Sequence, residues 1–146
     1  LAPRAAFAAV LVAVPFLFAV RGPGDPTVIY GDDDRTDLYA VTSDRDLQLA
    51  ASTVALVESA KLARNGTRFD ITAETFGRSF GLCTTERFFE QPSAAYCSGA
   101  LVSEDLVITA GHCIENQNEC DSTKFVFGYA VNQEGVFPTS VEENDV

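Results

Sequence analysis

The sequence contains no methionine, not even at position 1, and no tryptophan. We therefore expect this chain to be part of a longer protein. Basic residues are also scarce, since 10 lysines and arginines stand against 21 aspartates and glutamates, for a formal net charge of −11. A protein that binds nucleic acid needs a basic surface for the phosphate backbone, so the composition argues against nucleic acid as a partner.

Long hydrophobic runs are absent as well. The main apolar segment covers residues 5–20, follows Arg4 and is interrupted by Pro15. A membrane span needs about 20 apolar residues, whereas a positive residue, a short apolar stretch and then turn-forming residues are typical of a secretory signal peptide. We predict a signal peptide over residues 1–24, with an uncleaved N-terminal anchor as the alternative. The protein is then secreted, extracellular or periplasmic, with no membrane contact apart from such an anchor.

The remaining residues, 25–146, have the length of one domain. Hydrophobic residues make up 47% of the chain and charged residues 21%, which is the balance of a globular protein rather than a disordered one.

Closely spaced cysteine pairs are missing too. The chain has four cysteines with 13, 15 and 6 residues between them, at Cys83, Cys97, Cys113 and Cys120. Zinc sites use close pairs such as C-x2-C, which are absent here. His112 next to Cys113 is the one feature that favours zinc, and we predict no metal site. An even number of cysteines in an exported chain indicates disulfides, and three pairings are possible.

An acidic run lies near the N-terminus, with Arg35 among aspartates at positions 32, 33, 34 and 37. Clustered carboxylates can bind calcium, but the glycine and distant glutamate of an EF-hand loop are missing. We therefore predict a solvated acidic turn held by Arg35. Further along the chain, Asn65-Gly66-Thr67 indicates a turn and is also an N-glycosylation sequon.

The first regular elements are expected just after the acidic run. A helix is predicted to begin at Ser43 or Asp44 and to end at Leu49, and a strand rich in β-branched residues follows over 52–57. One longer amphipathic helix up to Arg64 is the alternative, because periodicity alone does not separate the two.

Short strands and turns dominate the rest of the chain. Residues 95–102 and 106–109 predict a hairpin with its turn at 103–105, and residues 124–131 predict a strand with a bulge at Gly128. Residues 69–92 are irregular, and residues 132–146 are polar and turn-like. The pattern predicts an all-β fold, an antiparallel barrel or sandwich.

The most informative stretch runs from Cys97 to Cys113 and reads CSGALVSEDLVITAGHC. It holds the only histidine of the chain, directly after small residues that would let the imidazole project from a strand end. Cys97 and Cys113 flank the predicted hairpin, so a disulfide between them is geometrically plausible. A histidine fixed on a rigid strand end suits a general base, because position matters before pKa.

This stretch resembles the histidine motif of the chymotrypsin-like (trypsin-like) serine peptidases. In that family a Cys-x-Gly-x-Leu-[Val/Ile] strand leads through a turn to [Val/Ile]-Thr-Ala-[Ala/Gly]-His-Cys. The resemblance implies a double β-barrel, of which this chain would form the first half, and cleavage of protein or peptide substrates without a cofactor. It also implies that His112 is the general base and that Cys97 is bonded to Cys113, which leaves Cys83 to pair with Cys120.

A weaker resemblance covers residues 28–35, which are similar to the mature N-terminus of the bacterial glutamyl endopeptidases. These enzymes are a branch of the same superfamily.

The other catalytic residues of the family are missing. No Gly-Asp-Ser-Gly-Gly motif occurs, and Ser98 does not match the nucleophile position. Asp145-Val146 is similar to the start of the family's aspartate strand, but its spacing from His112 is short, so we do not assign Asp145 as the catalytic acid. We predict the N-terminal part of a secreted serine endopeptidase that is inactive by itself. The alternative is a secreted, non-catalytic homologue that acts as a binding module.

One further motif, Gly77-Arg78-Ser79-Phe80-Gly81, fits the G-x-S-x-G nucleophile elbow of α/β-hydrolases. That elbow needs a strand before it, a long helix after it and parallel βαβ units. Pro92 follows soon after and no such units are predicted, so the sequence does not favour an α/β-hydrolase.

Overall fold

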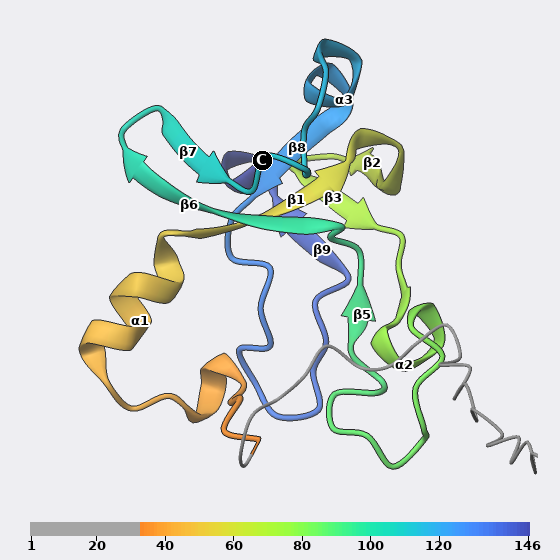
Figure 1. The fold of residues 1–146 in the computed structure, drawn as a ribbon. Helices are drawn as coiled ribbons and strands as arrows, with labels where there is room; N and C mark the ends of the chain where they lie inside the picture. Colours follow the sequence, from red (N-terminus) through yellow and green to blue (C-terminus); the bar gives the residue numbers. More distant parts are fainter. Residues whose placement is uncertain (1–32) are drawn as a thin grey trace, which may run out of the picture.

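The computed structural model describes residues 33–146, and the predicted signal peptide or anchor over residues 1–24 lies outside the described residues. The strands form three sheets, as Figure 1 shows, and every strand pair in the described part of the chain is antiparallel. The largest sheet has the order β7-β6-β1-β8, with β1 at Thr53–Glu58, β6 at Cys97–Ser103, β7 at Leu106–Thr109 and β8 at Thr123–Val126. The predicted all-β class is confirmed.

Two smaller sheets complete the described fold. One has the order β2-β3-β9, with β2 at Leu62–Asn65, β3 at Arg68–Ile71 and β9 at Ser140–Glu142. The other pairs β4 (Glu74–Thr75) with β5 (Pro92–Ser93). Three short α-helices lie outside the sheets, α1 (Asp44–Ala51), α2 (Phe76–Ser79) and α3 (Gln117–Ser122), together with 3-10 turns η1 (Leu38–Ala40), η2 (Ser59–Lys61) and η3 (Glu143–Asp145). None of the helices in residues 33–146 is long and apolar enough to span a bilayer.

β1 is the central strand and supplies both hydrophobic clusters. Val54 and Leu56, which are fully buried, pack with Cys113 on one face, and Val57 packs with Val126 and other residues on the opposite face. Each such side chain contributes about 1.5–3 kcal/mol when it is fully buried. Because both faces are covered, the strand is apolar along most of its length and does not alternate.

The helix and strand predicted after the acidic run are both present. Ser43 caps α1, since its Oγ accepts a hydrogen bond from the backbone N–H of Asp46 at 3.3 Å. The helix ends at Ala51, and β1 follows at once between β6 and β8. The alternative of one long helix up to Arg64 is therefore wrong.

The predicted hairpin is also confirmed, as β6 and β7. Its turn consists of Glu104 and Asp105, because Ser103 pairs with Leu106. Gly99 lets the two strands approach closely, since a Cβ there would lie 2.8 Å from the carbonyl oxygen of Ile108. The strand predicted over 124–131 is shorter than expected. It ends at Val126, and at Gly128 the backbone adopts a φ of 64° and the chain turns away from the sheet.

Five strands and two α-helices of the described residues were not predicted: β2, β3, β4, β5, β9, α2 and α3. β3 lies partly in the segment expected to be irregular, and β9 lies in the segment expected to be turn-like. β9 has only three residues with one buried side chain, Val141, so its alternation is too short to recognise. It is a strand because β3 offers a pairing edge, which is a tertiary effect.

Candidate functional site

His112 lies just past the end of β7, in a turn closed by a hydrogen bond of 2.9 Å from the Cys113 N–H to the Ala110 carbonyl. Its side chain is exposed and lines a surface recess of about 420 Å³. The other lining residues come from the end of β1, from η2 and from around α3: Glu58, Ser59, Ala60, Tyr96, Cys113, Glu115, Glu119, Ser122 and Thr123. The imidazole is therefore open to a molecule that enters from solvent.

A disulfide anchors the backbone next to the histidine. Cys113 is bonded to Cys97, the first residue of β6, with 6.0 Å between their Cα atoms. Cys113 is also buried against Val54 and Leu56 of the central strand. The neighbour of His112 is thus anchored both covalently and by packing, which is the preorganisation that a positioned base requires.

The far wall of the recess is a short chain of hydrogen bonds. The Thr123 hydroxyl donates to the Glu119 carbonyl oxygen at 2.6 Å, so the Tyr96 hydroxyl is the donor in its own 2.6 Å bond to Thr123 Oγ1. Glu119 Oε2 accepts from the Glu115 N–H at 2.7 Å, and Asn116 caps α3 by accepting from the Glu119 N–H. These contacts hold α3 against the recess.

Among residues 33–146, the imidazole has no partner of the kind that completes a catalytic triad. No described residue forms a hydrogen bond with His112 in the structure. Of the serines that line the recess, Ser122 donates to the Glu119 carbonyl at 3.1 Å. Asp145 lies in η3, where its backbone carbonyl accepts from the Phe127 N–H, and it does not line the recess.

The region that contains this site matches a known protein family. Residues 77–142 match the family model described as Trypsin, and the matched region includes the hairpin, the disulfide and His112. The match covers less than half of the chain and supports a fragment of the chymotrypsin-like serine peptidase family. Comparison with curated proteins and with solved structures gave no match. The antiparallel sheets are consistent with a partial trypsin-like β-barrel. Residues 28–35, which resemble the glutamyl endopeptidases, lie outside the matched region, so that resemblance stays a prediction.

The cysteines of the matched region agree with the prediction in one pair only. The Cys97–Cys113 disulfide is present, but Cys83 and Cys120 are both exposed free thiols, and the predicted bond between them is not formed. Cys120 belongs to α3, whereas Cys83 follows α2, and these two helices lie at opposite ends of the molecule (Figure 1). Pairing by elimination failed because it assumed that every cysteine is oxidised.

Three potential metal ligands do lie close together at the site. The ligand atoms of Cys97, His112 and Cys113 are within 4.8 Å of one another. The two sulfur atoms are joined in the disulfide, so neither is a thiolate that could bind zinc. While the disulfide is intact, the imidazole nitrogens of His112 are the only atoms of this group that can bind a metal ion.

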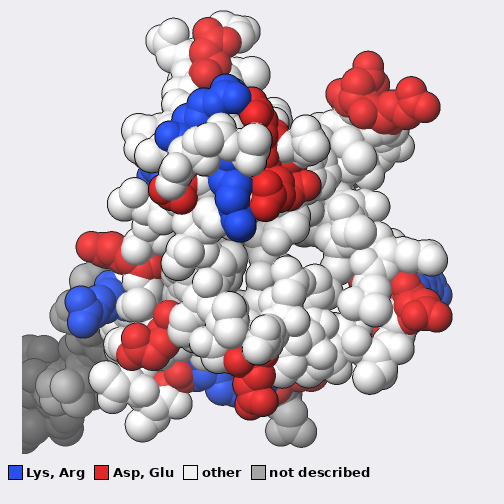
Figure 2. Space-filling view, turned by 180° about the vertical axis from the view of Figure 1, so that it is seen from behind, with Lys and Arg blue, Asp and Glu red and all other residues white. Residues whose placement is uncertain are grey.

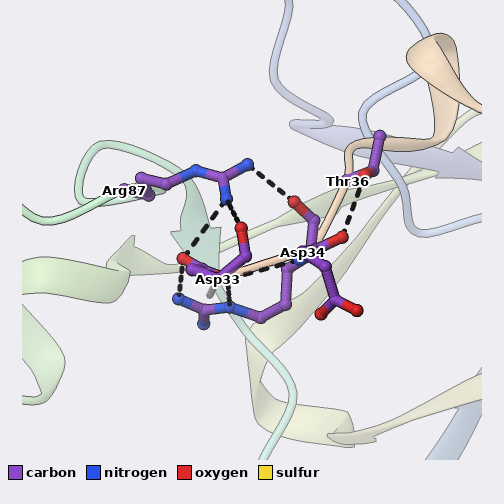
Figure 3. A network of polar contacts seen from close by, with 5 residues as sticks. Asp33, Asp34, Thr36 and Arg87 are labelled. Atoms are coloured by element: carbon purple, nitrogen blue, oxygen red, sulfur yellow. Dashed lines mark hydrogen bonds and ion pairs between the residues drawn. The ribbon is translucent and has the colours of Figure 1, made fainter. Parts of the chain in front are cut away.

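The acidic run is held as predicted, but by two arginines (Figure 3). Arg35 Nε donates to Asp33 Oδ1 at 2.8 Å. Arg87, which the sequence did not single out, donates to the carbonyl oxygens of Asp33 and Arg35, each at 2.6 Å. The Arg35 hydrogen bond above all, together with the charge of Arg87, lowers the pKa of Asp33 from 3.8 to about 2.

These contacts favour the acidic turn held by arginine over a calcium site at Asp33. The Asp33 carboxylate is engaged by guanidinium groups, so it is not free to bind calcium. Both arginines also contact the Phe88 ring, with the Arg35 and Arg87 guanidinium carbons 5.0 and 4.7 Å from its centroid. The segment that begins at Asp33 is thereby fastened to the loop before β5.

The G-x-S-x-G motif at residues 77–81 has a packing role in the structure. Gly77 and Ser79 lie in α2, which follows the two-residue strand β4 and has only four residues, so the long helix of a nucleophile elbow is missing. A Cβ at Gly77 would lie 2.0 Å from the ring of Phe89, so glycine is needed there for packing. The antiparallel sheets of the described residues agree with the sequence argument against an α/β-hydrolase.

The distribution of charge follows the excess of acidic residues. On the face shown in Figure 2, basic side chains lie next to acidic ones, and further acidic groups stand apart from them. Two arginines at the β2-β3-β9 sheet form ion pairs, Arg64 with Glu143 and Arg68 with Glu142. The exclusion of nucleic acid as a partner still rests on composition.

Proposed function

We propose that this chain is the N-terminal part of a secreted serine endopeptidase in which His112 is the general base. The observation that carries the proposal is the position of His112. It is exposed in a recess, beside a disulfide whose Cys113 is buried, within the region that matches the trypsin family. The substrates are proteins or peptides, as the family indicates.

In this role His112 takes the proton from a serine hydroxyl as the serine attacks the scissile carbonyl. It then gives the proton to the leaving amine, and the same exchange with water releases the acyl group. The protein supplies position, because the disulfide and the packing of Cys113 hold the backbone beside the imidazole. The serine and the aspartate that orients the imidazole come from residues outside this chain.

The first experiment tests the 146-residue chain itself. We expect no hydrolysis of casein or of fluorogenic peptides above the level of the His112→Ala variant. Cleavage by the wild-type chain that disappears in His112→Ala would show that the nucleophile is already present and would refute this part of the proposal.

The second experiment extends the chain by the coding sequence that follows Val146. In the longer protein His112→Ala should lower kcat by on the order of 10²–10⁴-fold, the usual contribution of a general base. Arg45→Ala, on the exposed helix α1, should leave kcat unchanged. An intact His112 in an inactive longer protein that binds peptides would instead support the non-catalytic binding module.

A further inference from the structure

Asn65 is the only asparagine of the chain that is followed by glycine. It is the last residue of β2, and Gly66 and Thr67 form the two-residue turn into β3, where Arg68 pairs with Asn65. All three residues from 65 to 67 are exposed. Gly66 has a φ of 65°, and a Cβ built on it would meet nothing within 4 Å. The peptide bond after Asn65 is therefore sterically open.

We propose that Asn65 is a site of spontaneous deamidation and that the modification loosens the β2-β3-β9 sheet. The backbone nitrogen of Gly66 attacks Cγ of Asn65, a new C–N bond closes a succinimide ring, and the bond from Cγ to Nδ2 breaks. The amide nitrogen leaves as ammonia and carries away the proton of the Gly66 nitrogen. Water then opens the ring at either carbonyl, which leaves aspartate or isoaspartate at position 65. Water is the only co-reactant.

Asp70 controls the rate of this reaction. Asn65 Nδ2 donates a hydrogen bond of 2.9 Å to Asp70 Oδ2, which holds the carboxamide in one orientation. The negative charge of Asp70 also disfavours the deprotonation of the Gly66 nitrogen that precedes attack. After deamidation the hydrogen bond is replaced by repulsion between two carboxylates, because the new acid at position 65 lies beside Asp70.

Isoaspartate has the larger structural effect. It adds one carbon to the main chain beside a two-residue turn, and the length of such a turn fixes the register of its strands. The same turn also contacts the end of β9, where η3 begins: the Thr67 carbonyl accepts from the Glu143 N–H at 2.9 Å. Arg64 binds Glu143 at 2.5 Å, and Arg68 binds Glu142 at 3.3 Å. A shift at position 65 therefore releases β9 and η3.

Ageing of the purified chain at mildly alkaline pH, followed by peptide mapping with mass spectrometry, tests the reaction. We expect a mass gain of about one dalton in the peptide that contains Asn65, at a rate within an order of magnitude of a free peptide of residues 62–71. The asparagines that do not precede glycine are internal controls: Asn116, Asn118, Asn132 and Asn144. An intact Asn65 under conditions that convert the free peptide would overturn the proposal.

Two variants test the structural argument. Asp70→Ala should accelerate deamidation several-fold, and a slower reaction would contradict the role given to Asp70. Asn65→Gln should abolish it, because glutamine cannot form the five-membered ring. Hydrogen exchange should show lost protection at β9 in aged wild-type protein and none in aged Asn65→Gln. Full protection of β9 in deamidated protein would rule out the coupling to the sheet.

Discussion

Arg87 joins two parts of the chain that are far apart in sequence. Its terminal nitrogens donate to the backbone carbonyls of Asp33 and Arg35, and its side chain covers one face of Phe88. Backbone carbonyls keep their charge distribution at every pH, whereas the carboxylate of Asp33 loses its charge in acid. The segment that begins at Asp33 is therefore held by two kinds of interaction. The hydrogen bonds to backbone carbonyls do not change with pH, whereas the interaction with the Asp33 carboxylate weakens when that group is protonated.

The interaction with the Asp33 carboxylate predicts a pH dependence. The pKa of Asp33 is lowered from 3.8 to about 2, chiefly by the Arg35 hydrogen bond. A lowered pKa in the folded state means that the contribution to stability is fully present above 3.8 and is lost as the pH falls through about 2. In an NMR titration we expect the Asp33 carboxyl to titrate near that lower value.

Two variants separate the causes. In Arg35→Ala the Asp33 midpoint should rise most of the way to its ordinary value, and in Arg87→Ala it should rise less, since the charge of Arg87 is the smallest cause. A larger rise in Arg87→Ala than in Arg35→Ala would reverse this assignment.

At the scale of the element, the β6–β7 hairpin is a covalently closed unit. The Cys97–Cys113 bond spans 16 positions and ties the strand end that carries His112 to the start of β6. The Thr109 hydroxyl adds a bond of 2.7 Å to the Ser98 carbonyl. The disulfide and this hydrogen bond therefore join the two strands of the hairpin at the end opposite to its turn.

Loss of that disulfide should lower stability measurably. A closed loop of this size contributes about 3 kcal/mol in the chain-entropy model, so the double variant Cys97→Ala, Cys113→Ala should lose about that much unfolding free energy in urea. The matched control is Cys83→Ala, Cys120→Ala, which removes two free thiols and should leave the unfolding free energy nearly unchanged. Equal losses in the two double variants would contradict the assignment.

The hairpin was predictable from sequence because all its information is local. Alternating apolar residues, a polar turn and a dense family motif lie within residues 97–113, and the family match includes them. β9 was not predictable, because a three-residue strand depends on the edge of β3. The same holds for Arg87, whose partners lie more than 50 positions away. At the site, the sequence pointed to His112 and its disulfide, but it did not reveal the tyrosine and the α3 residues that form the recess.

At the scale of the whole molecule, β7 is an open edge. Within residues 33–146 it pairs only with β6, and the hairpin presents Val102, Leu106 and Ile108 to solvent with more than half of each exposed. An exposed apolar edge strand is a template for pairing with another chain. The charged residues nearest to β7 in sequence are Glu104 and Asp105, in the turn of the hairpin.

We therefore expect the 146-residue chain to self-associate through this edge. Ile108→Lys places a charge on the edge strand and should reduce the association measured by light scattering. Phe80→Lys is the control, because it removes an equally exposed apolar side chain away from the sheet. A similar reduction by both variants would show that general hydrophobicity, and not strand pairing, drives association.

The two free thiols have a consequence for the handling of the protein. Cys83 and Cys120 are exposed and are not bonded to each other; Cys83 follows α2 and Cys120 lies in α3, helices that Figure 1 shows at opposite ends of the molecule. Each copy is therefore a bifunctional monomer with one reactive group at either end. Under oxidising conditions such monomers join head to tail or like to like, so the product is a linear covalent polymer whose length grows with protein concentration. A reductant strong enough to prevent polymerisation can also reduce the Cys97–Cys113 disulfide beside His112. Replacing Cys83 and Cys120 stops polymerisation and leaves that disulfide intact.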